Sequence, residues 1–77
     1  MIPKLARIFF ELFQLPPVDF NDKINPDQVP KWDSIGHMQL VAALEKEFDI
    51  KLSVSEIMEM MDVEGIISTL QKHGITE

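Results

Sequence analysis

The chain is 77 residues long, contains no cysteine and carries a formal net charge of −6. A chain of this length folds as one domain with a thin core, so a single domain is expected over residues 1–77. The lack of cysteine excludes disulfides, thiolate zinc sites and cysteine nucleophiles, and it is consistent with the reducing cytoplasm that we expect as its location. The negative charge argues against nucleic acid as a partner, and no apolar stretch is long enough for stable membrane insertion.

The acidic residues are concentrated in the second half of the chain. Between Glu45 and Glu64, seven acidic residues stand against two lysines. A localised acidic face favours basic partners, because complementary potentials raise the rate of encounter. The same face also keeps any small protein in solution, so the charge alone leaves both readings open.

The first predicted element is a helix over about Pro3 to Gln14. Its apolar residues recur at the i, i+3, i+4, i+7 spacing of one helix face. They are Ile2, Leu5, Ile8, Phe9, Leu12 and Phe13. Residues 16–32 form a long connection whose prolines break both helix and strand. We expect three apolar residues to anchor this connection to the core: Phe20, Ile24 and Val29.

The second predicted helix begins at Asp33 or Ser34, which are both strong N-cap residues, and runs to about Phe48. Six residues make up its expected buried face: Ile35, Met38, Val41, Ala42, Leu44 and Phe48. The order of apolar and polar residues gives no sign of a strand anywhere in the chain.

Two further helices follow. A capping box that starts at Ser53 predicts a short helix over about Val54 to Met60. Asp62 caps a last helix from Val63 to about His73, and Gly74 occupies the position of a left-handed C-cap. The apolar face of this last helix consists of Val63, Ile66, Ile67 and Leu70. The sequence thus predicts an all-α four-helix bundle with three longer helices, a short third helix and a long loop between helices one and two.

Few residues could carry catalysis. His73 is expected to be a surface residue at a helix end. Ser34 and His37 are three residues apart at a helix start and could touch, but a Ser-His pair also needs an orienting acid, an oxyanion site and a pocket. The run from Asp19 to Pro30 begins like a calcium loop but lacks its glycine and its final glutamate. We therefore expect neither an enzyme nor a metal site.

The stretch from Trp32 to Met38 places the Ser34 hydroxyl at the start of a helix, directly after the long loop. The first N–H groups of a helix are unpaired and its N-terminal dipole end is positive, so a phosphodiester on Ser34 would be stabilised there. Gly36 lacks a side chain two residues further on, which we interpret as space for a bulky modification. A plain helix cap is the alternative interpretation of Ser34, and Trp32 is most simply an anchor for the loop.

The segment from Lys31 to Leu52, KWDSIGHMQLVAALEKEFDIKL, resembles the acyl carrier protein family. That family carries Asp-Ser-Leu at the start of its second helix, followed by an apolar stripe that ends in acidic residues and a phenylalanine. The resemblance extends to the length, the helix order, the long first loop and the acidic second and third helices. It covers essentially the whole chain.

The resemblance implies that Ser34 receives a covalent 4′-phosphopantetheine arm from coenzyme A, on which acyl groups are held as thioesters. Asp33, Ile35 and Gly36 would surround the attachment site, and a phosphopantetheinyl transferase would read Asp33 and Ile35. Acyl-loading and acyl-processing enzymes would bind through basic patches to four glutamates: Glu45, Glu47, Glu56 and Glu59. A monomer without catalytic residues of its own is expected.

Some positions depart from carriers of housekeeping fatty acid synthesis. Ile35 replaces the usual leucine, and Gly36, Gln39 and Lys46 stand where those carriers commonly have acids. These departures weaken an assignment to bulk fatty acid synthesis. The pathway stays open among fatty acid, polyketide and specialised lipid pathways. Two alternatives stay open: a peptidyl or aminoacyl carrier that shares Ser34 and the arm, and a small acidic helical adaptor that is not modified.

A cleft between the second and third helices is a further hypothesis. Methionine side chains adapt to apolar guests of variable shape. The residues that could line the cleft and shelter an acyl chain are Val41, Leu44, Leu52, Ile57, Met60 and Met61. An ordinary core built from the same residues is the competing interpretation.

Overall fold

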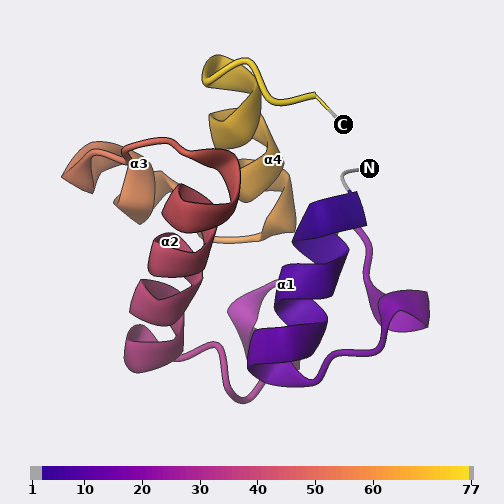
Figure 1. Cartoon of the computed structure of the whole chain (residues 1–77). Helices are drawn as coiled ribbons and strands as arrows, with labels where there is room; N and C mark the ends of the chain where they lie inside the picture. The colour runs from indigo at the N-terminus through magenta and orange to yellow at the C-terminus, as the bar shows by residue number, and fades with distance from the viewer. Residues whose placement is uncertain (1–2, 77) are drawn as a thin grey trace.

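The computed structural model describes residues 3–76 and contains α-helices and short 3-10 turns, with no strand in that range (Figure 1). The elements in chain order are α1 (Pro3–Phe13), η1 (Pro17–Asp19), η2 (Pro26–Gln28), α2 (Ser34–Phe48), α3 (Val54–Glu59) and α4 (Val63–Lys72). Three longer helices and a short third helix are therefore present, and the predicted all-α architecture is confirmed. None of the helices in this range is both long and apolar enough to cross a membrane.

The first helix follows the predicted periodicity. Its buried residues are Leu5, Ile8, Phe9 and Phe13. Leu12 packs partly buried against them, and Ile2, which was expected on the same face, lies outside the described residues. Gln14 ends the helix in the left-handed region, with φ 56°. The buried face packs against α2, beside which α1 lies in Figure 1.

The connection between α1 and α2 is anchored as expected, because Phe20, Ile24 and Val29 are all buried. Its prolines do not exclude all helical structure, since Pro17 and Pro26 each open a 3-10 turn. Trp32 closes the connection and is 3% exposed. Its indole packs edge-on against the ring of Phe9, with a centroid distance of 5.1 Å. The end of the loop is thereby fixed on the core next to the start of α2.

The buried face of α2 differs from the expected one. Gly36, Leu40, Val41 and Leu44 are buried, whereas the expected residues Ile35, Met38 and Ala42 are exposed and Phe48 is half-buried. Apolar residues lie on two sides of this helix, and only one side meets the core. Hydrophobicity alone does not decide which stripe is covered.

The last two helices have the predicted ends. Ser53 and Glu56 form the capping box of α3, and Asp62 accepts a hydrogen bond from the N–H of Gly65 at 2.7 Å to cap α4. Val63, Ile66 and Leu70 are buried and Ile67 is partly buried. At the end of α4, Gly74 has φ 82°. The N–H groups of Gly74 and Ile75 donate to the carbonyls of Gln71 and Leu70, both at 3.0 Å, as in a Schellman motif.

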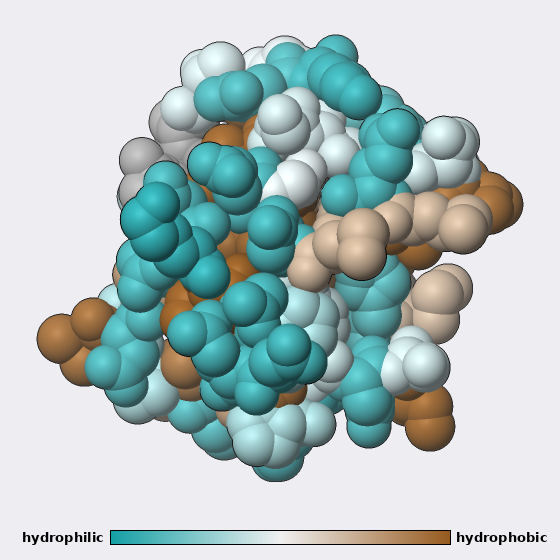
Figure 2. All heavy atoms as spheres, turned by 180° about the vertical axis from the view of Figure 1, so that it is seen from behind, coloured by the Kyte–Doolittle hydropathy of each residue, from teal (hydrophilic) through white to brown (hydrophobic). Residues whose placement is uncertain are grey.

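The surface is divided between hydrophilic and apolar regions. Viewed from behind, the molecule shows a largely hydrophilic face, with apolar side chains projecting at the sides of the outline (Figure 2). The most exposed large apolar residues near α2 and α3 are Ile35, Val54, Met58 and Met61. Exposed apolar surface is therefore concentrated around the start of α2 and along α3.

Candidate functional site

Ser34 is the first residue of α2, and its side chain is exposed. The helix is capped by the preceding residue, since the carboxylate of Asp33 accepts from the N–H of Gly36 at 2.8 Å. The interpretation of Ser34 as the helix cap is therefore wrong. Within residues 3–76, neither the Ser34 hydroxyl nor its N–H has a hydrogen-bond partner. The hydroxyl is free to carry a substituent without loss of a bond that holds the fold.

Gly36 serves the packing of the loop. A Cβ at this position would collide with the carbonyl oxygen of Lys31 and would lie 3.1 Å from the ring of Phe13. The space beside Gly36 is thus filled by the chain itself, and the interpretation of this glycine as room for a bulky modification is wrong. The glycine instead lets the end of the loop approach α2 closely, which sets the position of Asp33 and Ser34.

A cleft of about 600 Å³ lies beside Ser34. It is lined by Pro26, Trp32, Asp33, Ser34, His37, Met38, Ile57, Met58, Met60 and Met61. The expectation of an apolar cleft between α2 and α3 is met in part. Ile57, Met60 and Met61 line the cleft, as expected, but the other three residues lie in the core: Val41, Leu44 and Leu52. The cleft therefore opens nearer to the start of α2 than the sequence indicated.

His37 connects the loop, α2 and α3. The indole N–H of Trp32 donates to its Nδ1 at 2.9 Å, and its Nε2 lies 3.0 Å from the carbonyl oxygen of Ile57. Because Nδ1 accepts, the ring proton is assigned to Nε2, which donates to that carbonyl. The indole and imidazole planes are nearly parallel, at 15°. Both ring nitrogens are occupied, so His37 is not arranged as a base for Ser34.

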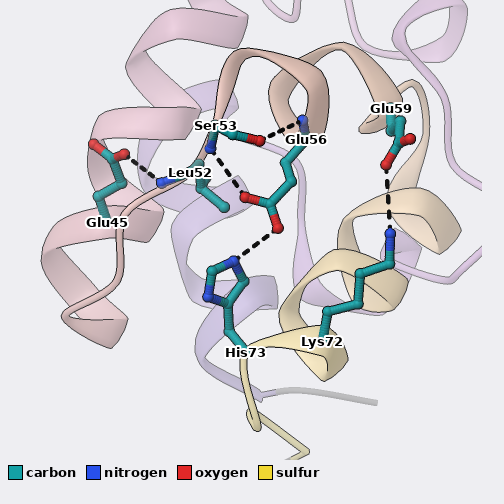
Figure 3. A network of polar contacts seen from close by, with 7 residues as sticks. All are labelled: Glu45, Leu52, Ser53, Glu56, Glu59, Lys72 and His73. Atoms are coloured by element: carbon teal, nitrogen blue, oxygen red, sulfur yellow. Dashed lines mark hydrogen bonds and ion pairs between the residues drawn. The ribbon is translucent and has the colours of Figure 1, made fainter.

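The four glutamates expected to meet partners all have contacts within the chain. Figure 3 shows three of them. Glu45 accepts from the N–H of Leu52 at 2.9 Å, and Glu59 lies 3.5 Å from the ammonium of Lys72. The fourth, Glu47, pairs with the guanidinium of Arg7 at 2.8 Å.

Glu56 is the most constrained of the four. Its Oε1 accepts from the N–H of Ser53 at 2.9 Å, and its Oε2 lies 2.9 Å from Nε2 of His73 (Figure 3). The hydrogen bond from the Ser53 N–H, followed by the contact with His73, holds the pKa of Glu56 below its ordinary value. His73 is half-buried and bonded to α3, whereas the sequence indicated only a surface residue at a helix end. No local sequence signal links positions 56 and 73, because the contact depends on how α3 packs against α4.

Among residues 3–76, no three histidine, aspartate or glutamate side chains come together in a way that could hold a metal ion. The site combines an exposed hydroxyl, a helix start and an apolar cleft. These three features are adjacent: Ser34 begins α2 and also lines the cleft.

A protein-family model for the phosphopantetheine attachment site matches residues 32–70, slightly more than half of the chain. The matched segment begins at Trp32 and includes all of α2 and α3 and most of α4. A comparison with curated proteins gave no match. The chain belongs to the family of phosphopantetheine-binding carrier domains. Domains of this family carry a covalent 4′-phosphopantetheine and work with a phosphopantetheinyl transferase and partner enzymes.

The residues around Ser34 fit such an arm. The hydroxyl is exposed and unpartnered within the described residues, and the positive end of α2 favours a phosphodiester at this point. The cleft offers apolar side chains from three methionines on its rim: Met38, Met58 and Met61. When bound, the arm supplies a thiol that holds its cargo as a thioester.

Proposed function

We propose that Ser34 is the attachment residue for the arm and that the protein is an acyl carrier. The observation that carries this proposal is the exposed Ser34 hydroxyl, which has no partner in residues 3–76 and stands at the mouth of the apolar cleft. Asp33 holds the helix end in place, and the first N–H groups of α2 stabilise the phosphate. The protein then acts by presenting a tethered substrate, which each partner meets at high effective concentration.

An acyl cargo is favoured over an aminoacyl cargo by the lining of the cleft. Apart from Asp33, Ser34 and His37, its lining residues are apolar. An alkyl chain gains from contact with such side chains, whereas a charged amino group loses its hydration there. A fatty acid, polyketide or specialised lipid pathway is consistent with this lining. A peptidyl or aminoacyl carrier is the alternative within the class.

Partner enzymes with basic patches are part of the same proposal. The four expected contacts lie on α2 and α3, and Glu59, whose side chain is 58% exposed, is the most exposed of them. Charges at such a rim speed encounter and leave the complex short-lived, which suits a carrier that visits several enzymes.

The attachment residue is tested by intact mass after incubation with coenzyme A, magnesium and a phosphopantetheinyl transferase of broad specificity. Wild type is expected to gain one phosphopantetheinyl group, and Ser34→Ala none. Ser55→Ala is the matched control, because Ser55 is also an exposed serine in the first turn of a helix but does not line the cleft. Modification of Ser34→Ala would place the arm on another residue. No modification of folded wild type by any transferase tried would support the unmodified adaptor instead.

A further inference from the structure

The helix α3 forms one wall of the cleft but has little contact with the core. None of its six residues is buried, and Val54 and Met58 are 74% and 71% exposed. The first fully buried side chain after it is Met60. A helix this short gains little stability from its own backbone bonds. Its position must therefore depend on contacts from neighbouring elements.

Polar contacts hold α3 on two sides. On the side of α4, Glu56 bonds to His73 and Glu59 pairs with Lys72 (Figure 3). On the side of α2, the hydrogen bond from His37 Nε2 to the carbonyl of Ile57 spans the cleft, since both residues line it. Both histidines of the chain thus contact α3, but only His37 does so at the cleft.

We infer that His37 is a positioning residue that holds α3 against α2 and sets the width of the cleft beside Ser34. Trp32, which is fixed in the core, donates to Nδ1 and so orients the imidazole with its proton on the side of Ile57. The bridge from the core to α3 therefore runs through one imidazole ring. The effect of the cleft width on a tethered cargo rests on the proposed function. The hydrogen bonds of the bridge are already present in the unmodified protein.

The carboxylates near α3 do not replace this bridge. Asp33, which also lines the cleft, caps α2. On α3, the carboxylates of Glu56 and Glu59 bond on the side of α4. Loss of the bond from His37 to the Ile57 carbonyl is therefore expected to loosen α3 on its α2 side.

The sequence provides its own reporters of this contact. Trp32 is the only tryptophan and there is no tyrosine, so its fluorescence reports directly on the imidazole that it contacts. Of the five methionines, four line the cleft: Met38, Met58, Met60 and Met61. Carbon-13 labelling of methionine methyl groups thus places NMR probes around the cleft and on both of its walls.

The experiment records Trp32 emission, methionine methyl spectra and amide exchange on the unmodified protein and its variants at neutral pH. His37→Gln offers both an acceptor and a donor, and His37→Phe offers neither. His73→Gln is the control, because it changes the histidine on the other side of α3. Circular dichroism verifies that each variant is folded.

In His37→Phe, Trp32 emission and the Met58 and Met61 methyl signals are expected to change together. His37→Gln should change them less, and His73→Gln should leave Trp32 emission as in wild type. The Ile57 N–H, which donates to the Ser53 carbonyl within α3, should exchange about fivefold faster in His37→Phe, because α3 loses one hydrogen bond that holds it against α2. The inference fails if His37→Phe leaves both this exchange and the methyl signals unchanged, or if His73→Gln changes Trp32 emission as much as His37→Phe does.

The two proposals fail separately. The assays of the bridge contain no arm, so they report on His37 whether or not Ser34 is modified. A protein that gains no phosphopantetheine but shows the expected response of the His37 variants keeps the bridge and loses the carrier assignment. A protein that gains phosphopantetheine but lacks the expected response of the His37 variants keeps the carrier assignment and loses the role proposed for His37.

Discussion

The carboxylate of Asp33, and not the hydroxyl of Ser34, accepts the hydrogen bond from the N–H of Gly36. The residue that caps α2 and the residue proposed to carry the arm are thus direct neighbours with separate tasks. Modification of Ser34 removes no hydrogen bond found among the described residues. The helix start is therefore expected to be equally stable with and without the arm.

This separation predicts effects of different size on stability for two adjacent substitutions. Asp33→Ala should lower the free energy of unfolding by about 1 kcal/mol, the usual effect of losing an N-cap. Ser34→Ala should change it by less than about 0.5 kcal/mol, because no bond within the described residues is lost. Urea denaturation measures both values. Equal destabilisation by the two variants would show that Ser34 contributes to the cap.

Gly36→Ala is expected to destabilise the fold strongly. The added methyl group would collide with the backbone carbonyl of Lys31, which cannot rotate away as a side chain does. Forced overpacking of this kind costs about 1 to 3 kcal/mol, and the value should fall in the upper part of that range. Gly74→Ala is the control, since it meets no atom within 4 Å but must adopt φ 82°, at a cost of about 1 kcal/mol. A smaller effect at Gly36 than at Gly74 would contradict the packing described above.

The contacts of Glu56 predict a dependence of stability on pH. Its pKa is lowered by the Ser53 N–H and then by His73, so the ionised carboxylate is more stable in the folded state than in the unfolded chain. The resulting stabilisation is present above the ordinary pKa of a glutamate, about 4.3. It is lost as the pH falls through the lowered pKa of Glu56. In thermal unfolding, the acid limb, which is the fall of the melting temperature with decreasing pH, should thus be flatter for Glu56→Gln than for wild type.

A suitable control for this acid limb is Glu11→Gln, which removes one charge from an exposed position on α1. It should leave the acid limb as steep as in wild type. Glutamine at position 56 can still serve in a capping box, so that variant should remain folded at neutral pH. Identical acid limbs for wild type and Glu56→Gln would rule out the contribution of Glu56.

Glu59 offers a test of the acidic partner face that leaves the fold intact. Its ion pair with Lys72 is exposed on both sides, so Glu59→Gln should change stability by less than about 0.5 kcal/mol. Loss of the charge should slow association with a basic phosphopantetheinyl transferase, and the difference should shrink at high salt. Lys72→Gln keeps the carboxylate and should not slow association. Stopped-flow rates that are equal for all three proteins would argue against contact at this position.

An acyl group on the arm is expected to reach the cleft. The Met58 and Met61 methyl signals should move when an octanoyl thioester replaces the free thiol, and an acetyl thioester should move them less because it buries less apolar surface. Shifts confined to Ser34 and Ile35 would show that the chain stays outside. This comparison needs only the loaded and unloaded protein, without a partner enzyme.

The helix ends could be predicted from the sequence because their signals are local. Asp33, Ser53 and Asp62 each cap a helix through an N–H three residues ahead, and Gly74 takes the left-handed conformation that ends α4. Such bonds depend on a few neighbouring residues and little on the rest of the fold. The order and extent of the helices follow from them.

The buried face of α2 and the polar contacts across the bundle could not be predicted in the same way. Ile35 and Met38 are apolar like Leu40, and the position of α1 and the loop decides which of them is covered. The bonds of His37 to Ile57 and of Glu56 to His73 join residues that are 20 and 17 positions apart. One sequence carries no signal for such pairs, so the role of His37 emerged only from the structure.

The lining of the cleft overlaps little with the core. Of the residues that line it, only Trp32 and Met60 belong to the buried cluster, whereas Met38, Met58 and Met61 are more than half exposed. Replacing these three side chains would reshape the cleft at little cost to folding. Over evolutionary time, such a carrier can therefore change the guest that it accommodates while its scaffold stays the same, and the three methionines are the first positions for redirecting it by design.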